Sequence, residues 1–237
     1  MTLAAFKTLL LEDDPLMRRF VSLALDETAC ELTFCQDVPQ ALAALSAQRF
    51  DFILTDLMLP GESGLSFIRR LAADKTLAQG AQIVALSAGI DAAMMSELTL
   101  LGVQKQLLKP VSVKALQAVF ETTPETQAEQ PLHTQQAIER YFGGQQELFR
   151  QFKAQSLSLF AQDVKKGDAL VEALDFQALH QLAHSLKSAL LLLGEEDAHK
   201  LALELEHDLA KHPEPREVTR QWQTLRLLLL ELSSNGS

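Results

Sequence analysis

Acidic, hydroxyl and basic side chains stand at the ends of the apolar runs in the first half of the sequence. The adjacent pair Glu12 and Asp13, then Asp56, Ser87 and Lys109, each close or directly follow such a run. Two or three carboxylates together are the oxygen ligands that Mg²⁺ prefers. In such a group Asp56 is a candidate nucleophile for a phosphoryl group, with the lysine ammonium and the serine hydroxyl facing the phosphate oxygens.

Alternating strand and helix patterns position these residues. Short apolar runs predict five strands, at 6–11, 32–35, 52–55, 83–87 and 104–108, and helical patterns follow them, at 16–25, 38–45, 65–73, 91–101 and 113–120. Asp14 and Pro15 are typical of a helix N-cap and first helical position. Repeated βαβ units predict a doubly wound α/β fold with a five-stranded parallel sheet. Because the carboxyl ends of parallel strands share one edge, we expect the polar residues to meet in one crevice.

The first half of the chain resembles the receiver domain of two-component response regulators, which has a flavodoxin-like fold. The matching motifs occur in order from residue 6 to about residue 120: Glu12-Asp13, Asp56 followed by Met58, Pro60 and Gly61, Ser87-Ala88, and Lys109-Pro110. The resemblance implies that Asp56 accepts phosphate. It also implies that Mg²⁺ is bound by Asp13, Asp56 and the backbone carbonyl of Met58, with Glu12 assisting through water.

One position departs from the family pattern. The family usually has an aromatic residue three positions before the lysine, and here that position is Gln106. The chemistry at Asp56 does not depend on this residue, whereas the usual coupling between phosphorylation and a surface change does.

The second half of the chain predicts helices alone. Residues 121–132 are polar with two prolines and indicate an exposed linker. Beyond it, helical patterns are expected at 137–142, in a long helix ending near Lys166 where Gly167 and Asp168 interrupt it, from the cap Asp175 to Leu193 before Gly194, across the leucines of 201–209, and at about 217–232. Short connections between the four longer helices predict an antiparallel four-helix bundle.

His184 is the candidate reactive residue of this helical half. It lies three positions before Lys187, so both share a helix face, where a neutral imidazole nitrogen takes a phosphoryl group and the ammonium offsets its charge. Residues 175–206 resemble a histidine phosphotransfer (HPt) domain in a pattern of Ala183, His184, Leu186, Lys187, Ser188 in place of a glycine, Gly194 and Leu205-Glu206. The resemblance implies that His184 is phosphorylated. We interpret His180, one turn earlier, as a rim residue.

Composition excludes several classes of protein. The 237 residues are 47% hydrophobic and 22% charged, which is typical of one or two globular domains. A net charge of −10 disfavours binding to nucleic acid or to an anionic membrane. Two cysteines, Cys30 and Cys35, indicate neither a disulfide framework nor a metal site. The start has no signal-peptide layout and the leucine runs are too short to span a bilayer, so we expect a cytoplasmic protein.

Together these patterns predict a phosphorelay protein with a receiver domain at 1–120, a linker at 121–132 and an HPt bundle at 133–237. The expected partners are a sensor histidine kinase or another phosphohistidine donor, and a response regulator receiver domain. Without a glycine-rich nucleotide loop, autonomous kinase activity is not expected and the chain is a phosphotransfer intermediate. Two alternatives stay open, namely a binding module in which the phosphorylated receiver controls access to the HPt face, and the carboxyl-terminal part of a hybrid sensor kinase. The initial methionine close to the first strand favours a standalone protein.

Overall fold

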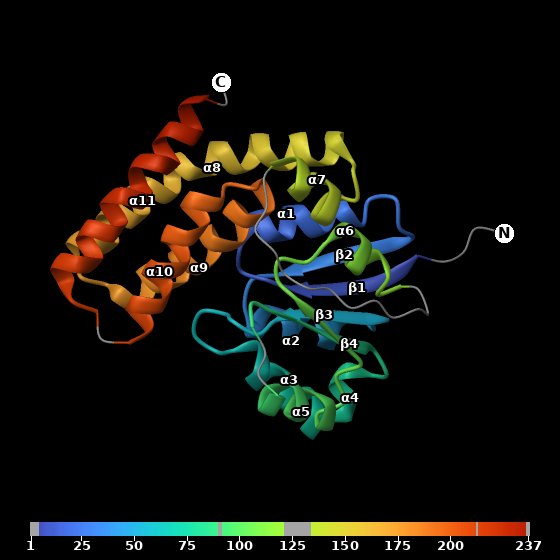
Figure 1. Ribbon diagram of the computed structural model, residues 1–237. Helices are drawn as coiled ribbons and strands as arrows, with labels where there is room; N and C mark the ends of the chain where they lie inside the picture. Colours follow the sequence, from blue (N-terminus) through green and yellow to red (C-terminus); the bar gives the residue numbers. More distant parts are fainter. Residues whose placement is uncertain (1–4, 90–91, 121–133, 212, 236–237) are drawn as a thin grey trace. The chain divides into compact units, whose positions relative to one another are not determined.

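The computed structural model describes residues 5–89, 92–120, 134–211 and 213–235 (Figure 1). The chain divides into two compact units, Met1–Thr126 and Gln127–Ser237. The linker predicted at 121–132 lies outside the described residues, as does the first residue of the helix predicted at 91–101.

A five-stranded sheet forms the centre of the first unit. Its strands are β1 (Phe6–Leu11), β2 (Cys30–Cys35), β3 (Phe52–Asp56), β4 (Gln82–Ser87) and β5 (Lys105–Leu108). They run in the order β2-β1-β3-β4-β5, and every neighbouring pair is parallel. The predicted doubly wound parallel sheet is confirmed. The strand order reverses between β1 and β3, which is where such sheets bind ligands beyond the carboxyl ends of their strands.

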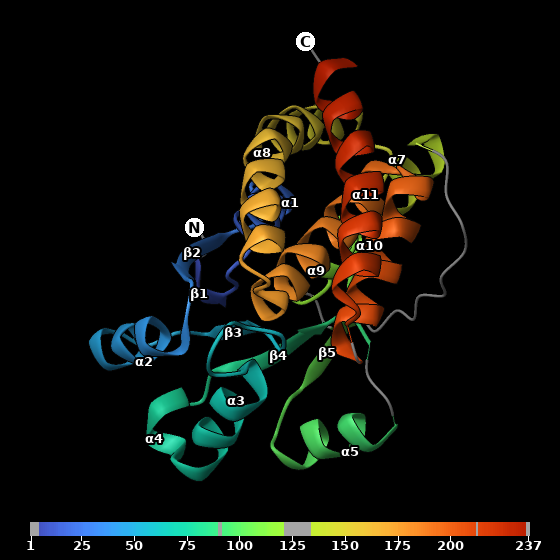
Figure 2. The same ribbon diagram turned by 90° about the vertical axis from the view of Figure 1, so that its left-hand side faces the viewer.

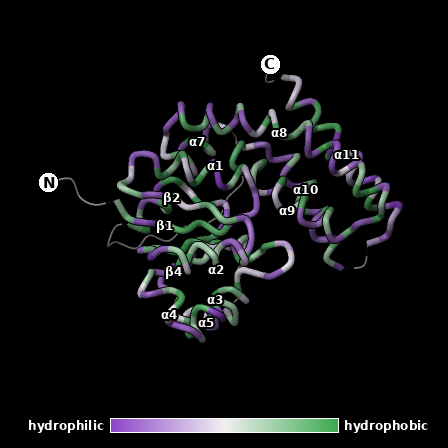
Figure 3. Tube along the Cα trace, turned by 180° about the vertical axis from the view of Figure 1, so that it is seen from behind, coloured by the Kyte–Doolittle hydropathy of each residue, from purple (hydrophilic) through white to green (hydrophobic). Residues whose placement is uncertain are grey.

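Helices cover both faces of this sheet. They are α1 (Pro15–Ala24), α2 (Val38–Ala47), α3 (Gly64–Ala73), α4 (Lys75–Ala78), α5 (Ala92–Leu100) and α6 (Val113–Gln117). In Figure 1, α1 and α6 lie on one face, and α2, α3 and α5 lie on the other. The core beneath the second face includes Ile53, Phe67 and Ile68, which are fully buried. In Figure 3 much of β1 is drawn in the hydrophobic colour, as expected for a central strand covered on both sides.

Local capping explains where these helices begin. The Asp14 carboxylate accepts hydrogen bonds from the amides of Leu16 and Met17, with Pro15 in the first turn, as predicted. The short helix α4 was not predicted. It forms because Asp74 leaves the helical conformation at the end of α3 and its carboxylate accepts from the Thr76 amide, which starts a new turn.

The second unit is entirely helical over its described residues, which confirms the predicted all-α class. Its helices are α7 (Thr134–Phe142), α8 (Gln146–Glu172), α9 (Phe176–Leu193), α10 (Glu196–Ala210) and α11 (Pro215–Asn235). Each of the four long helices packs against two others, α8 and α10 both contacting α9 and α11 (Figure 2). The predicted limits of α9 are confirmed, since Asp175 caps it and Gly194 ends it with φ +74°. Among the described helices, none is long and apolar enough to cross a bilayer.

The predicted interruption at Gly167 and Asp168 is wrong. Helix α8 continues through both residues to Glu172. Gly167 is present because the Trp222 ring of α11 lies against the backbone there, so near that an added Cβ would lie 2.0 Å from the ring. Asp168 accepts hydrogen bonds from the Trp222 indole and from Arg226, both on α11. Contacts with α11 therefore explain two residues that the local pattern indicated as a helix end.

Candidate functional site

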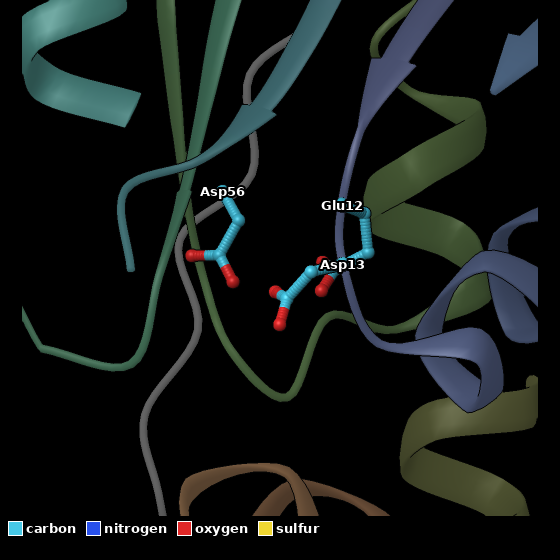
Figure 4. A group of neighbouring side chains, drawn as sticks. All are labelled: Glu12, Asp13 and Asp56. Carbon is cyan, nitrogen blue, oxygen red and sulfur yellow. The ribbon is translucent and has the colours of Figure 1, made fainter. Parts of the chain in front are cut away.

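The acidic residues at the carboxyl ends of β1 and β3 lie together (Figure 4). Glu12 and Asp13 follow β1, and Asp56 is the last residue of β3. One carboxylate oxygen from each of the three lies within 4.8 Å of the others. Glu12 and Asp56 are each 1% exposed. The predicted meeting of these residues at one sheet edge is therefore observed, and three close oxygen ligands are a donor set that suits Mg²⁺.

Lys109 joins the two buried carboxylates. Its Nζ lies 2.6 Å from Glu12 Oε2 and 2.7 Å from Asp56 Oδ2. Burial acts to lower the lysine pKa, but the charges of Glu12 and Asp56 outweigh it and the pKa is raised. The ammonium therefore stays charged beside Asp56, although these residues are 53 positions apart.

The remaining predicted residues of the receiver site are placed by its loops. Asp56 Oδ1 accepts a hydrogen bond of 2.9 Å from the Met58 amide, which holds the carboxylate and brings the backbone of Met58 beside it. The Ser87 hydroxyl donates to the Gly89 carbonyl at 2.9 Å and accepts from the Gly89 amide at 3.3 Å. It is thus engaged in its own loop rather than with Asp56.

Electrostatics in the acidic cluster disfavour further negative charge. Burial raises the pKa of Glu12 to about 8, with the charges of Asp56 and Asp14 adding to the effect and Lys109 opposing it. The pKa of Asp13 is raised as well, by burial and by the charges of Asp56 and Asp14. One ammonium does not balance this many carboxylates, so a bound cation would stabilise their charged forms.

A second group of side chains forms between α9 and α10. His184 Nδ1 lies 2.5 Å from Glu206 Oε1, and Lys187 Nζ lies 2.5 Å from Glu206 Oε2. His184 and Lys187, which were predicted to share a helix face, thus both bond to one carboxylate. That carboxylate lies 22 positions beyond the histidine in the sequence. The sequence interpretation included Glu206 in the Leu205-Glu206 pattern but gave it no role. The Leu205-Glu206 pattern was the one sign in the sequence that Glu206 matters. Its contact with His184 could not be predicted, because it depends on how α10 packs on α9.

Glu206 determines which nitrogen of His184 carries a proton. Burial acts to raise the pKa of Glu206, but hydrogen bonds from His184 and Lys187 outweigh it and lower the pKa to about 2. An ionised carboxylate only accepts hydrogen bonds, so Nδ1 must be the donor. In a neutral imidazole the lone pair is then on Nε2. That atom is buried and has no hydrogen-bond partner among the described residues.

Ser188 and His180 are the other α9 residues noted in the sequence, and His199 lies on α10. Ser188 is buried and its hydroxyl donates to the His184 carbonyl at 3.4 Å. His180 is half-buried, and burial lowers its pKa. His199 contacts the Lys187 carbonyl through Nδ1 at 2.9 Å. These contacts support the position of α9 and α10 around the His184 group.

Glu206→Gln is expected to make the second unit less stable in a pH-dependent manner. The folded pKa of about 2 lies below the unfolded value of roughly 4.3. The charged group therefore stabilises the fold above about pH 5, and this is lost as the pH falls towards 2. We expect a difference on the order of 2 kcal/mol at pH 7 that disappears at low pH. Urea unfolding between pH 2 and 7, followed by the fluorescence of Trp222, measures it.

Glu217→Gln provides the matched control, because Glu217 pairs with Arg220 on the exposed face of α11. Exposed pairs of this kind contribute little to stability, so this variant should follow the wild-type pH profile. A Glu206→Gln curve parallel to the wild-type curve at every pH would contradict the prediction.

The first unit is similar to known proteins. Residues 8–121 match the family described as the response regulator receiver domain. The chain is 32% identical over 113 residues to the transcriptional activator protein PfeR of Pseudomonas aeruginosa, covering 47% of this chain and 35% of PfeR. It is 32% identical over 112 residues to the DNA-binding response regulator MtrA of Mycolicibacterium smegmatis, covering 47% of each protein. The chain thus spans less than half the length of these two curated relatives.

Among solved structures, the chemotaxis protein CheY4 of Vibrio cholerae is similar to the first half. The match has 24% identity and a TM-score of 0.47, and it covers 50% of this chain and 98% of CheY4.

Proposed function

We propose, on the basis that residues 8–121 are a response regulator receiver domain, that the chain is a phosphorelay signalling protein. Asp56 accepts a phosphoryl group in a Mg²⁺-dependent reaction, and His184 receives phosphate from, or donates it to, a receiver aspartate. The observation that carries the proposal is the burial of Asp56 between the ammonium of Lys109 and the acidic pair Glu12 and Asp13. The proposed domains are a receiver at 1–120, a linker at 121–132 and an HPt bundle at 133–237.

Transfer to Asp56 exchanges one bond at phosphorus for another. A carboxylate oxygen of Asp56 attacks the phosphorus of a donor phosphohistidine, an O–P bond forms and the N–P bond breaks. The electron pair of the broken bond stays on the donor imidazole, which takes a proton from solvent. Lys109 offsets the charge that develops on the phosphoryl oxygens, and Ser87 donates to one of them after leaving Gly89.

The residues present fit a magnesium ion. Asp13, Asp56 and the backbone carbonyl of Met58 would hold it, with Glu12 assisting through water. When bound, it supplies positive charge that neutralises the incoming phosphoryl group. The close carboxylates support this, and the pKa values of Glu12 and Asp13, raised first by burial, agree with it, because a bound cation would stabilise the charged carboxylates.

Transfer at His184 uses the opposite pair of groups. The Nε2 atom, which is buried in this structure, first becomes accessible to the donor. Its lone pair then attacks the phosphorus of an aspartyl phosphate, an N–P bond forms, and the O–P bond breaks with its electron pair returning to the partner carboxylate. Glu206 holds the Nδ1 proton and stabilises the positive charge that the imidazole gains. Lys187 donates to the same carboxylate, and in this proposal its ammonium offsets the charge on the phosphoryl oxygens. The implied partners are a phosphohistidine donor, such as a sensor histidine kinase, and a receiver domain carrying aspartyl phosphate.

Intact mass after incubation of the full chain with acetyl phosphate and Mg²⁺ tests the proposal. The wild-type chain should gain one phosphoryl group, and Asp56→Asn should gain none. Asp51→Asn is the matched control, because Asp51 is an exposed residue just before β3 whose carboxylate accepts a hydrogen bond from the Lys7 amide. Labelling of Asp56→Asn at the wild-type level would reject Asp56 as acceptor.

The chemistry of the adduct tests His184. Aspartyl phosphate is alkali-labile, whereas phosphohistidine is acid-labile and alkali-stable. An alkali-stable adduct that requires both Asp56 and His184, and that persists in His180→Gln, would demonstrate transfer within this protein. If no phosphohistidine forms with acetyl phosphate or with a phosphorylated receiver domain as donor, the role of His184 is wrong.

A further inference from the structure

An arginine on α1 contacts the backbone of the acidic pair. Arg18 Nη1 donates to the carbonyl oxygen of Glu12 at 2.8 Å and to that of Asp13 at 2.7 Å. Arg18 is half-buried, whereas its neighbour Arg19 is exposed. Neither arginine was singled out by the sequence patterns.

The position of Arg18 has an electrostatic cost that these contacts offset. Its amide bonds to the Asp14 carbonyl at 3.0 Å, so it lies in the first turn of α1. The amino end of a helix carries the positive end of the helix dipole, and a cation there is unfavourable. Two charge-assisted hydrogen bonds to carbonyl oxygens compensate for this and direct the guanidinium back towards the end of β1.

These bonds constrain the segment that carries the carboxylates. Two consecutive carbonyls held by one group fix the orientation of both peptide planes between β1 and α1. The side chains of Glu12 and Asp13 leave that backbone on the side of Asp56, where their oxygens meet within 4.8 Å (Figure 4). The guanidinium also occupies the two carbonyl oxygens, so a cation at this edge of the sheet meets carboxylate oxygens instead.

We infer that Arg18 is a positioning residue for the magnesium site, acting through the backbone of Glu12 and Asp13. The inference rests on the proposed function, since that proposal places Mg²⁺ at these carboxylates. The affinity for Mg²⁺ then depends partly on Arg18, a residue that does not touch the metal. Outer partners of this kind often change metal affinity by a factor of about 10 to 100 when they are removed.

Direct Mg²⁺ titration of the full chain by isothermal calorimetry tests the role of Arg18. Arg18→Ala and Arg19→Ala each remove one positive charge from adjacent positions of α1. Loss of charge alone would strengthen Mg²⁺ binding in both variants. We expect the opposite for Arg18→Ala, a Kd for Mg²⁺ raised about tenfold, while Arg19→Ala stays within about twofold of the wild-type chain. Arg18→Lys keeps a donor and should give an intermediate Kd.

The possible results distinguish the role of Arg18 from the proposed magnesium site on which that role depends. If the wild-type chain binds Mg²⁺ and Arg18→Ala binds it equally or more tightly, the role of Arg18 is rejected and the metal site stands. If the wild-type chain binds no Mg²⁺, the proposed metal site fails and the role of Arg18 fails with it. Far-UV circular dichroism of each variant at the titration temperature verifies folding, and the intermediate affinity of Arg18→Lys supports positioning even where Arg18→Ala is unstable.

Discussion

Gly64→Ala is expected to destabilise the first unit by about 3 kcal/mol or more and to slow phosphorylation of Asp56 by about 100-fold. A Cβ at position 64 would lie 1.8 Å from the carbonyl oxygen of Asp56 and 2.9 Å from Thr55 Oγ1. The first of these contacts is backbone and belongs to the last residue of β3, so relief requires that α3 and the strand end move apart. That movement displaces Asp56 from Lys109. A misplacement of reacting groups by about 1 Å can lower the reaction rate by about 100-fold.

Urea unfolding by far-UV circular dichroism and the rate of labelling by acetyl phosphate measure the two effects of Gly64→Ala. Gly61→Ala is the matched control in the same loop. Gly61 has φ +80° but nothing within 4 Å of an added Cβ, so its substitution introduces backbone strain of about 1 kcal/mol without a clash. If both variants lose the same stability and rate, strain rather than close packing explains Gly64, and the prediction is wrong.

Gly167→Ala is expected to destabilise the second unit by about 3 kcal/mol, although the same change in an ordinary helix interior stabilises by about 1 kcal/mol. The added Cβ would lie 2.0 Å and 2.2 Å from two atoms of the Trp222 ring, which is 1% exposed. A buried ring cannot move away freely, and its indole also donates to Asp168. The substitution therefore separates α8 from α11.

Fluorescence of Trp222, the one tryptophan of the chain, follows the unfolding of this unit in urea. Ala169→Gly changes an exposed position two residues further along α8 and should lower the free energy of unfolding by about 1 kcal/mol. This control shows that alanine is ordinarily the more stabilising of the two residues in this helix. The double variant Gly167→Ala with Trp222→Leu, followed by circular dichroism, should show a coupling that recovers part of the loss. A Gly167→Ala variant more stable than the wild-type chain would contradict this prediction.

The alternation of strands and helices in the first unit was predictable because it depends on local patterns. Apolar runs, the Asp14 and Pro15 start of α1, and the Asp175 and Gly194 limits of α9 each involve neighbouring residues. Parallel topology then places all carboxyl strand ends on one edge, so the grouping of Glu12, Asp13, Asp56 and Lys109 followed without knowledge of any distance. The match of residues 8–121 to the receiver domain agrees with this part of the prediction.

Errors and omissions concentrate where distant segments meet. Gly167 was interpreted as a helix end because glycine is a weak helix former, whereas the Trp222 ring, 55 positions later, requires a residue without a side chain. Glu206 received no role because its hydrogen bonds cross from α10 to α9.

The sequence by itself determined the periodicity, the helix caps and the kinds of reactive group at the strand ends, since these depend on residues within a few positions of one another. The tertiary structure alone decided which groups share a proton or a charge. Lys109 is bonded to both Glu12 and Asp56, Glu206 holds Nδ1 of His184, and Arg18 holds two carbonyls of the acidic loop. The physical reason is that hydrogen bonds and ion pairs require separations near 3 Å, and only the packing of whole elements sets distances that small between residues far apart in the chain.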